Sequence, residues 1–87
     1  MSHREATIDV TPFRHAISAQ LARGVPASEL CLRAGYVQRS GKGDTTRLKR
    51  AAGLAPDRRG KAAVLVTPDT ALRLVRALAA DPVDFAL

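Results

Sequence analysis

The sequence has little cysteine, few aromatic residues and no long hydrophobic run, and each shortage excludes a class of protein. Cys31 is the single cysteine, which rules out an internal disulfide and indicates a reducing compartment or indifference to redox state. Together with His3 and His15 it provides too few ligands for a metal site. No apolar run approaches the ~18 residues of a membrane span. No signal peptide is present either, so we expect a cytoplasmic protein without a membrane segment.

The residue patterns of common enzyme classes are also missing. The chain shows no paired carboxylates and no catalytic triad, and a domain of this size is too small to enclose a deep pocket. Cys31 is expected to be a small core residue rather than a nucleophile, because no histidine lies near it in the sequence. We therefore expect no enzyme activity, no catalytic residue, no cofactor and no metal.

What is present suits one small helical domain. Alanine and leucine dominate the composition and favour helices. Phe13, Tyr36 and Phe85 are the three aromatic residues, so the core is expected to be aliphatic. With 87 residues and a hydrophobic fraction of 46%, residues 1–87 are expected to fold as a single domain around one core.

The net charge of +6 comes entirely from residues 38–61, here called the basic segment. It carries eight lysine and arginine residues against Asp44 and Asp57, whereas basic and acidic residues cancel elsewhere. A neutral scaffold that presents one basic segment is typical of polyanion binding, because neutralised phosphates release counterions. The alternative is a solvated loop whose charge aids solubility. We favour nucleic acid because the surrounding elements also predict a DNA-binding fold.

Prolines, glycines and apolar spacing predict four helices, over residues 11–24, 26–35, 44–53 and 67–81. Thr11, Asp44 and Thr67 are expected to be the N-caps. A last turn after Asp81 is expected to fold back on the core through Val83, Phe85 and Leu87. The side chains expected to face the core are Phe13, Ile17 and Leu21 in the first helix, Leu30, Cys31 and Ala34 in the second, Leu48, Ala51 and Ala52 in the third, and Ala71, Leu72, Val75, Leu78 and Ala79 in the fourth.

Two short segments predict strands. Residues 6–10 alternate between apolar and polar side chains, and residues 62–66 form an apolar run. Pairing of the two would close the domain with a small two-stranded ribbon. The expected fold class is therefore mainly α, with four to five short helices and this ribbon.

Residues 24–35 resemble the first helix of a helix-turn-helix motif. Leu30 stands at the inward anchor position, Cys31 at the place of a small residue, and Gly35 in the turn. The order of elements is similar to that of the lambda-repressor-like, Cro-type class, whose closing segment residues 67–85 resemble. The resemblance implies that the helices are arranged around a helix-turn-helix.

The chain from residue 12 to 87 also resembles small helix-turn-helix proteins of actinobacteria and their phages, in the run 43–50 and the ending 81–84. This resemblance implies a sequence-specific DNA-binding protein, often a regulator or immunity-type repressor, with residues 44–52 as recognition helix. The connection departs from the pattern, because the usual turn has about three or four residues. Here roughly eight, residues 36–43, precede the third helix. The register of the recognition helix is therefore open, and the loop itself is a candidate for phosphate contact.

Side-chain chemistry assigns roles within the basic segment. Arginine pairs bidentately with guanine, lysine acts as a point charge on phosphate, and the N-terminal residues of a recognition helix enter the groove first. For each residue the alternative is a solvated surface side chain. Base or near-base contacts are predicted for Thr45, Thr46, Arg47 and Arg50, a phosphate contact for Lys49, and backbone or minor-groove contacts for Gln38, Arg39, Ser40, Lys42, Arg58, Arg59 and Lys61.

The leading hypothesis is a small transcriptional regulator that binds double-stranded DNA and is nucleoid-associated when bound. Such proteins usually dimerise on paired half-sites. The candidate dimer surface is the C-terminal segment 74–87, with Leu74, Val83, Phe85 and Leu87. Two alternatives stay open. One is a phage-type interaction module that binds an acidic host protein, and the other is an architectural or recombination accessory factor that bends DNA.

Overall fold

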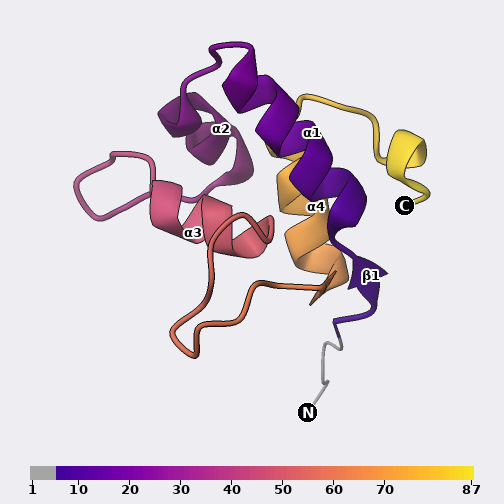
Figure 1. Ribbon diagram of the computed structural model, residues 1–87. Coiled ribbons are helices and arrows are strands. Elements are labelled where there is room, and N and C mark those ends of the chain that lie inside the picture. Colours follow the sequence, from indigo (N-terminus) through magenta and orange to yellow (C-terminus); the bar gives the residue numbers. More distant parts are fainter. Residues whose placement is uncertain (1–5) are drawn as a thin grey trace.

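The computed structural model describes residues 6–87, so His3 and the charges of Arg4 and Glu5 lie outside the described residues. The described chain is mainly helical with one small antiparallel ribbon, which confirms the predicted fold class (Figure 1). In chain order the elements are β1 (Ile8–Asp9), α1 (Thr11–Ala22), α2 (Ala27–Ala34), α3 (Thr45–Ala51), β2 (Leu65–Val66), α4 (Pro68–Ala77) and the 3-10 helix η1 (Pro82–Phe85).

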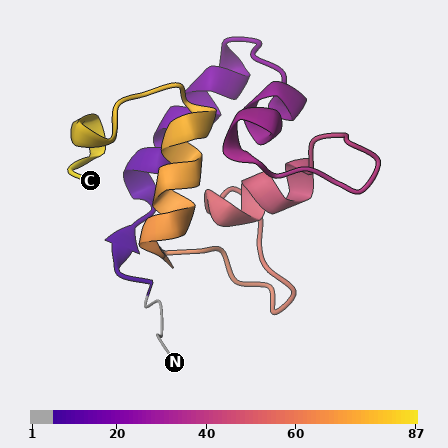
Figure 2. The same cartoon turned by 180° about the vertical axis from the view of Figure 1, so that it is seen from behind.

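Helix α4 lies at the centre of the arrangement. It packs against α1, α2, α3 and η1, while α2 also packs against α3 (Figures 1 and 2). Ala71, Leu74, Val75 and Ala77 of α4 are all buried, because neighbouring helices cover this helix from several sides. The central position of α4 leaves α3 at the edge of the molecule, with one face on the core and the other toward solvent.

The predicted ribbon is confirmed, although it is shorter than the two segments from which it was predicted. Ile8 pairs with Val66 and Asp9 with Leu65 in an antiparallel register. The Thr7 N–H donates to the Val66 carbonyl (3.1 Å) and the Val10 N–H to the Val64 carbonyl (3.0 Å). The ribbon ties the start of α1 to the start of α4, which fixes the far end of the long connection between α3 and α4.

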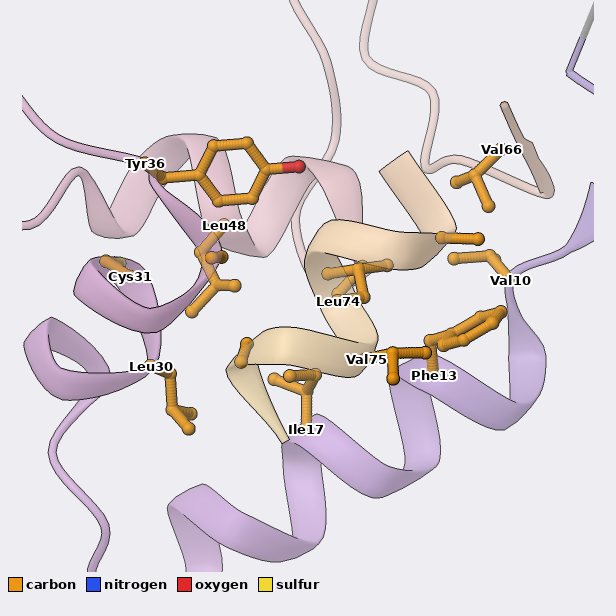
Figure 3. Packing of buried hydrophobic residues seen from close by; sticks show 14 residues of the cluster. Val10, Phe13, Ile17, Leu30, Cys31, Tyr36, Leu48, Val66, Leu74 and Val75 are labelled. Atoms are coloured by element: carbon orange, nitrogen blue, oxygen red, sulfur yellow. The ribbon is translucent and has the colours of Figure 1, made fainter. Parts of the chain in front are cut away.

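The core is mostly aliphatic, but Phe13 and Tyr36 are also buried in it, so the prediction of a purely aliphatic core is wrong; all four α-helices contribute to it (Figure 3). Each large apolar side chain buried in this way stabilises the fold by about 1.5–3 kcal/mol. Cys31 is a fully buried core residue, as expected from the sequence, and its burial raises the pKa of the thiol. The largest fully buried side chains are Phe13, Ile17, Leu30, Leu48, Leu74, Val10, Val75 and Cys31.

Capping was predicted correctly for α3 and α4 and wrongly for α1. The Thr67 hydroxyl accepts from the Thr70 N–H (3.2 Å), but Thr11 is itself the first residue of α1. Val10 at the N-cap position already has helical backbone angles, so the chain turns one residue earlier than expected. The Asp9 carboxylate then accepts from the Thr11 N–H (2.8 Å), and this bond lowers the pKa of Asp9.

The predicted inner face of α4 is partly wrong. Leu72 is 40% exposed and Ala79 lies beyond the helix, whereas Leu74 is completely buried. The difference arises because contacts from several helices make the buried face of α4 wider than a single stripe. Leu74 is therefore a core residue and is not available for a dimer surface.

The C-terminal segment folds back through one of its three predicted side chains. The Phe85 ring stacks on the Phe13 ring of α1, with ring centroids 4.8 Å apart. Val83 remains 75% exposed and Leu87 38% exposed, so the prediction that they pack on the core is wrong. Asp81 opens this turn by accepting a hydrogen bond from the Val83 N–H (3.0 Å).

Candidate nucleic-acid interface

Helix α3 presents a basic face because its apolar side chains fix the opposite face to the core. Leu48 and Ala52 are completely buried, while Arg47, Lys49 and Arg50 are exposed. Thr46 is exposed as well, and Thr45 is half-buried. Of the three side chains predicted to face inward, Ala51 is only half-buried.

The start of α3 is fixed by the predicted cap. The Asp44 carboxylate accepts from the Arg47 N–H (3.1 Å), which satisfies an amide of the first turn. Arg47 and Arg50, three residues apart, lie on the same side of the helix. Arg47 and Arg50 therefore share one solvent-facing side of the helix, and Lys49 is exposed next to Arg50 along the chain.

The long connection between α2 and α3 is an ordered excursion with a narrow base. Gly35 ends α2 in the left-handed conformation (φ +81°), as predicted, and Tyr36 is buried immediately after it. The Asp44 N–H donates to the Tyr36 carbonyl (2.8 Å), and Val37 forms an isolated bridge with Gly43. The two ends of the connection therefore meet beside the core, and only residues 38–42 project from it.

Gly43 allows this base to lie directly on α2. A Cβ atom on Gly43 would come within 2.8 Å of the Cys31 Cβ and 2.9 Å of the Ser28 carbonyl oxygen. Cys31 is consequently the small residue over which the connection passes. This contact explains how a connection longer than the usual turn stays fixed to the second helix.

Residues 38–42 form a closed turn at the tip of this connection. The Gln38 N–H donates to the Lys42 carbonyl (2.8 Å) and the Gly41 N–H to the Gln38 carbonyl (2.9 Å). Gly41 has a positive φ of +86°, which an L-residue adopts only with strain. The turn exposes Gln38, Arg39, Ser40 and Lys42, the side chains predicted to contact the DNA backbone or minor groove.

Residues 57–61 form a second closed turn in the connection that follows α3. The Asp57 N–H donates to the Lys61 carbonyl (2.8 Å) and the Gly60 N–H to the Asp57 carbonyl (2.9 Å). The Asp57 carboxylate accepts from the Arg59 N–H (2.8 Å) and the Lys61 N–H (3.0 Å). The turn exposes Arg58, Arg59 and Lys61, which are the remaining predicted backbone contacts.

Hydrogen bonds to Asp57 hold the pKa of this carboxyl below its ordinary range, with the Lys61 N–H the largest cause and the Arg59 N–H the next. The positive charges of Arg59 and Arg50 act in the same direction.

The cations of the basic segment have no carboxylate partner within residues 6–87. The ion pair between Arg33 and Glu29 lies on α2, outside the segment (3.0 Å). Asp44 and Asp57, the two acids of the segment, accept hydrogen bonds from backbone amides. All eight basic side chains are exposed, so their charge is available to an external anion.

Tyr36 is a site residue that the sequence alone did not identify. The guanidinium of Arg47 lies 5.0 Å from the centre of its ring, and that of Arg73 lies 5.6 Å from it. Arg73 also donates to the Ala34 carbonyl at the end of α2 (3.0 Å). Burial raises the pKa of Tyr36 in spite of both arginines, which keeps the ring neutral.

A sequence signal for Tyr36 did exist, since it is the single tyrosine and directly follows the glycine that ends α2. No local pattern points to Arg73, because it reaches Ala34 and Tyr36 from α4, far along the chain. Arg73 links α4 to the place where the connection to α3 begins.

The interface as a whole consists of α3 and the two turns on either side of it in the sequence. In Figures 1 and 2 the first loop extends beyond the start of α3 on the side away from η1, and the second loop hangs below α3. His15 lies exposed on α1 and takes no part in this surface. The structure thus places the predicted site residues on three exposed pieces that follow one another along the chain: the first turn, α3 and the second turn.

Within the described residues, no three His, Cys, Asp or Glu side chains come together in a way that could hold a metal ion. None of the helices in that part of the chain is long and apolar enough to cross a membrane. Compared with models of protein families, with curated proteins and with solved structures, the chain gives no match. Function is therefore inferred from the chain's own geometry and charge.

Proposed function

We propose that the protein binds double-stranded DNA in a sequence-specific way, with α3 as the recognition helix, and acts as a small transcriptional regulator. The observation that carries the proposal is the basic face of α3. Arg47, Lys49 and Arg50 point to solvent without carboxylate partners in residues 6–87, while Leu48 fixes the helix from behind. A helix so presented matches the chemistry of the major groove, where arginine reads guanine.

The dimensions support this role. An α-helix with its side chains is about 10–12 Å across, and the major groove is about 12 Å wide. Arg47 is held against Tyr36 and so loses less freedom when it binds than an unsupported arginine would. We assign base contacts to Thr45, Thr46, Arg47 and Arg50 and a phosphate contact to Lys49.

A homodimer remains part of the proposal, because a recognition helix this short reads few base pairs and paired half-sites would extend the target. In the segment 74–87 the side chains left for such a contact are Val83 and Leu87, which are exposed. Leu74 is excluded by its burial, and Phe85 is half-buried in its stack on Phe13.

The test is the selection of bound sequences from a random duplex library at about 150 mM salt, which suppresses purely electrostatic binding. We expect one enriched motif, and its symmetry reports whether two copies bind together. Absence of enrichment, with binding that disappears as salt rises, would reject the proposal and favour an acidic protein partner. Bending of the selected duplex by the protein would favour the architectural alternative.

Variants of α3 then test the assignment of roles. Arg47→Ala and Arg50→Ala should each weaken binding to the selected duplex by about 1–3 kcal/mol and relax specificity at one position. Lys49→Ala should weaken binding to selected and random duplexes alike, and Arg23→Ala, outside the basic segment, is the charge-matched control. Equal losses on random DNA for all three variants of α3 would contradict its role in recognition.

A further inference from the structure

The two turns that flank α3 carry the same sequence pattern. Residues 38–42 read Gln-Arg-Ser-Gly-Lys and residues 57–61 read Asp-Arg-Arg-Gly-Lys. In both, arginine takes the second position, glycine the fourth and lysine the fifth.

The two turns also share one backbone conformation. In each, the first N–H donates to the fifth carbonyl at 2.8 Å, and the fourth N–H donates to the first carbonyl at 2.9 Å. The glycine at the fourth position has φ of +86° in one turn and +80° in the other. The arginine and lysine of each turn therefore stand at equivalent positions of a similarly closed backbone.

Glycine is required in both turns by the backbone conformation that closes them, and not by the approach of a neighbouring segment. A Cβ atom on Gly41 or on Gly60 would meet nothing within 4 Å, so only the positive φ calls for glycine there. The repeated feature is thus a closed turn that carries one exposed arginine at its second position and one exposed lysine at its fifth.

Each turn is attached to a different end of α3. The first is connected through the hydrogen bond between the Asp44 N–H and the Tyr36 carbonyl, immediately before the helix begins. The second follows the end of the helix, where the Lys49 carbonyl accepts from the N–H groups of Leu54 and Ala55. In Figures 1 and 2 the first loop extends beyond the start of α3, and the second leaves the end of the helix and hangs below it.

We infer that the two turns are matching phosphate clamps, which hold the two DNA strands that border the major groove while α3 lies between them. The inference rests on the proposed function. Arginine offers a planar fork to a phosphate and lysine a compact charge, so each Arg-X-Gly-Lys turn suits one segment of backbone. Because one turn leads into α3 and the other leads out of it, a helix seated in the major groove brings one turn toward each of the bordering strands.

The test compares three double variants on the selected duplex. Arg39→Ala with Lys42→Ala removes the first clamp, Arg58→Ala with Lys61→Ala removes the second, and Arg23→Ala with Arg76→Ala removes two charges outside the basic segment. We expect each clamp variant to reduce the slope of log Kd against log salt by about 1.8, because each lost phosphate contact contributes about 0.9. The control variant should leave the slope unchanged.

Phosphate-ethylation interference locates the contacts. For the wild-type protein, ethylation should block binding at two groups of phosphates, one on each strand. Each clamp variant should lose one of these groups and keep the other. Arg39→Lys and Arg58→Lys should keep the wild-type slope of log Kd against log salt, because lysine retains the positive charge. Circular dichroism of each variant checks that the fold is retained.

The possible failures are distinguishable. The clamps are overturned if the clamp variants bind the selected duplex with an unchanged slope of log Kd against log salt and ethylation interferes at one group of phosphates only. That result would leave DNA recognition by α3 intact. A loss of both groups in either variant would show that the turns do not act on separate strands and would overturn the inference as well. A chain that selects no duplex at all would overturn the clamps together with the proposed function.

Discussion

At the scale of single residues, the contact between Tyr36 and Arg47 joins the core to the recognition surface. Tyr36 is 3% exposed and belongs to the core cluster, yet its ring lies beneath an arginine expected to reach DNA. Arg73 approaches the same ring and holds the end of α2 through the Ala34 carbonyl. The position of the Arg47 side chain therefore depends on how well the core is packed.

Replacing the ring should weaken DNA binding without unfolding the protein. Tyr36→Leu keeps an apolar side chain but removes the aromatic face, so affinity for the selected duplex should fall by about 0.5–1 kcal/mol, the strength of an exposed cation–π contact. Tyr36→Phe, which keeps the face, is the matched control. The effect should disappear when Arg47 is already alanine, and an undiminished loss in that background would contradict the role of Tyr36.

At the scale of elements, the base of the connection between α2 and α3 depends on Gly43. Gly43→Ala would force a Cβ atom to within 2.8 Å of Cys31, and overpacking of this kind costs about 1–3 kcal/mol. Gly41→Ala, at the open tip, meets no such contact and should cost less, since only the positive φ opposes it. Urea denaturation of both variants measures the difference, and an equal or smaller loss for Gly43→Ala would contradict the close packing on α2.

The second turn should loosen in acid, whereas the first should not. Hydrogen bonds from Lys61 and Arg59 lower the pKa of Asp57 in the folded turn, so its carboxylate stabilises the turn above the pKa of the unfolded chain, about 3.9. That contribution is lost as the pH falls through the lower folded value. Below about pH 4 the amides of Arg59 and Lys61 should therefore lose protection and shift in NMR spectra.

Asp57→Asn separates the charge from the geometry of this turn. The asparagine oxygen still accepts hydrogen bonds, but it does not titrate, so the acid-induced shifts of Arg59 and Lys61 should vanish in this variant. The turn at residues 38–42, which begins with Gln38, serves as the internal control in the same spectra. A pKa for Asp57 at its ordinary value would contradict the assigned hydrogen bonds.

At the scale of the whole molecule, the parts of the fold that depend on local sequence were predictable. Asp44 and Thr67 are recognisable caps, Gly35 is a recognisable helix end, and the ribbon partners show alternation and an apolar run. The inner face of α4 was not predictable from one stripe, because its extent depends on how many other helices cover α4. Leu74 and Leu72 exchanged their expected places for this reason.

The candidate site was predictable in its charges but not in its supports. The exposed cations follow from composition, and the face of α3 follows from Leu48 and the spacing around it. The placing of Gly43 against Cys31, and of Arg73 against Tyr36, joins segments that no local rule connects. These contacts determine where the long connection lies, and with it the position of α3.

The predicted dimer is a property of the whole molecule, and Val83 allows it to be tested apart from folding. Because Val83 is 75% exposed, Val83→Asp removes little packing and should leave the free energy of unfolding within about 0.5 kcal/mol of the wild type. If residues 74–87 form the dimer contact, a buried aspartate would separate the two copies. Sedimentation should then show a monomer, and binding to paired half-sites should fall to that of a single half-site.

Ala22→Asp, at an exposed position on α1, is the matched control. A Val83→Asp protein that still sediments as a dimer would place the contact elsewhere, and a wild-type monomer on a single half-site would remove the dimer from the proposal.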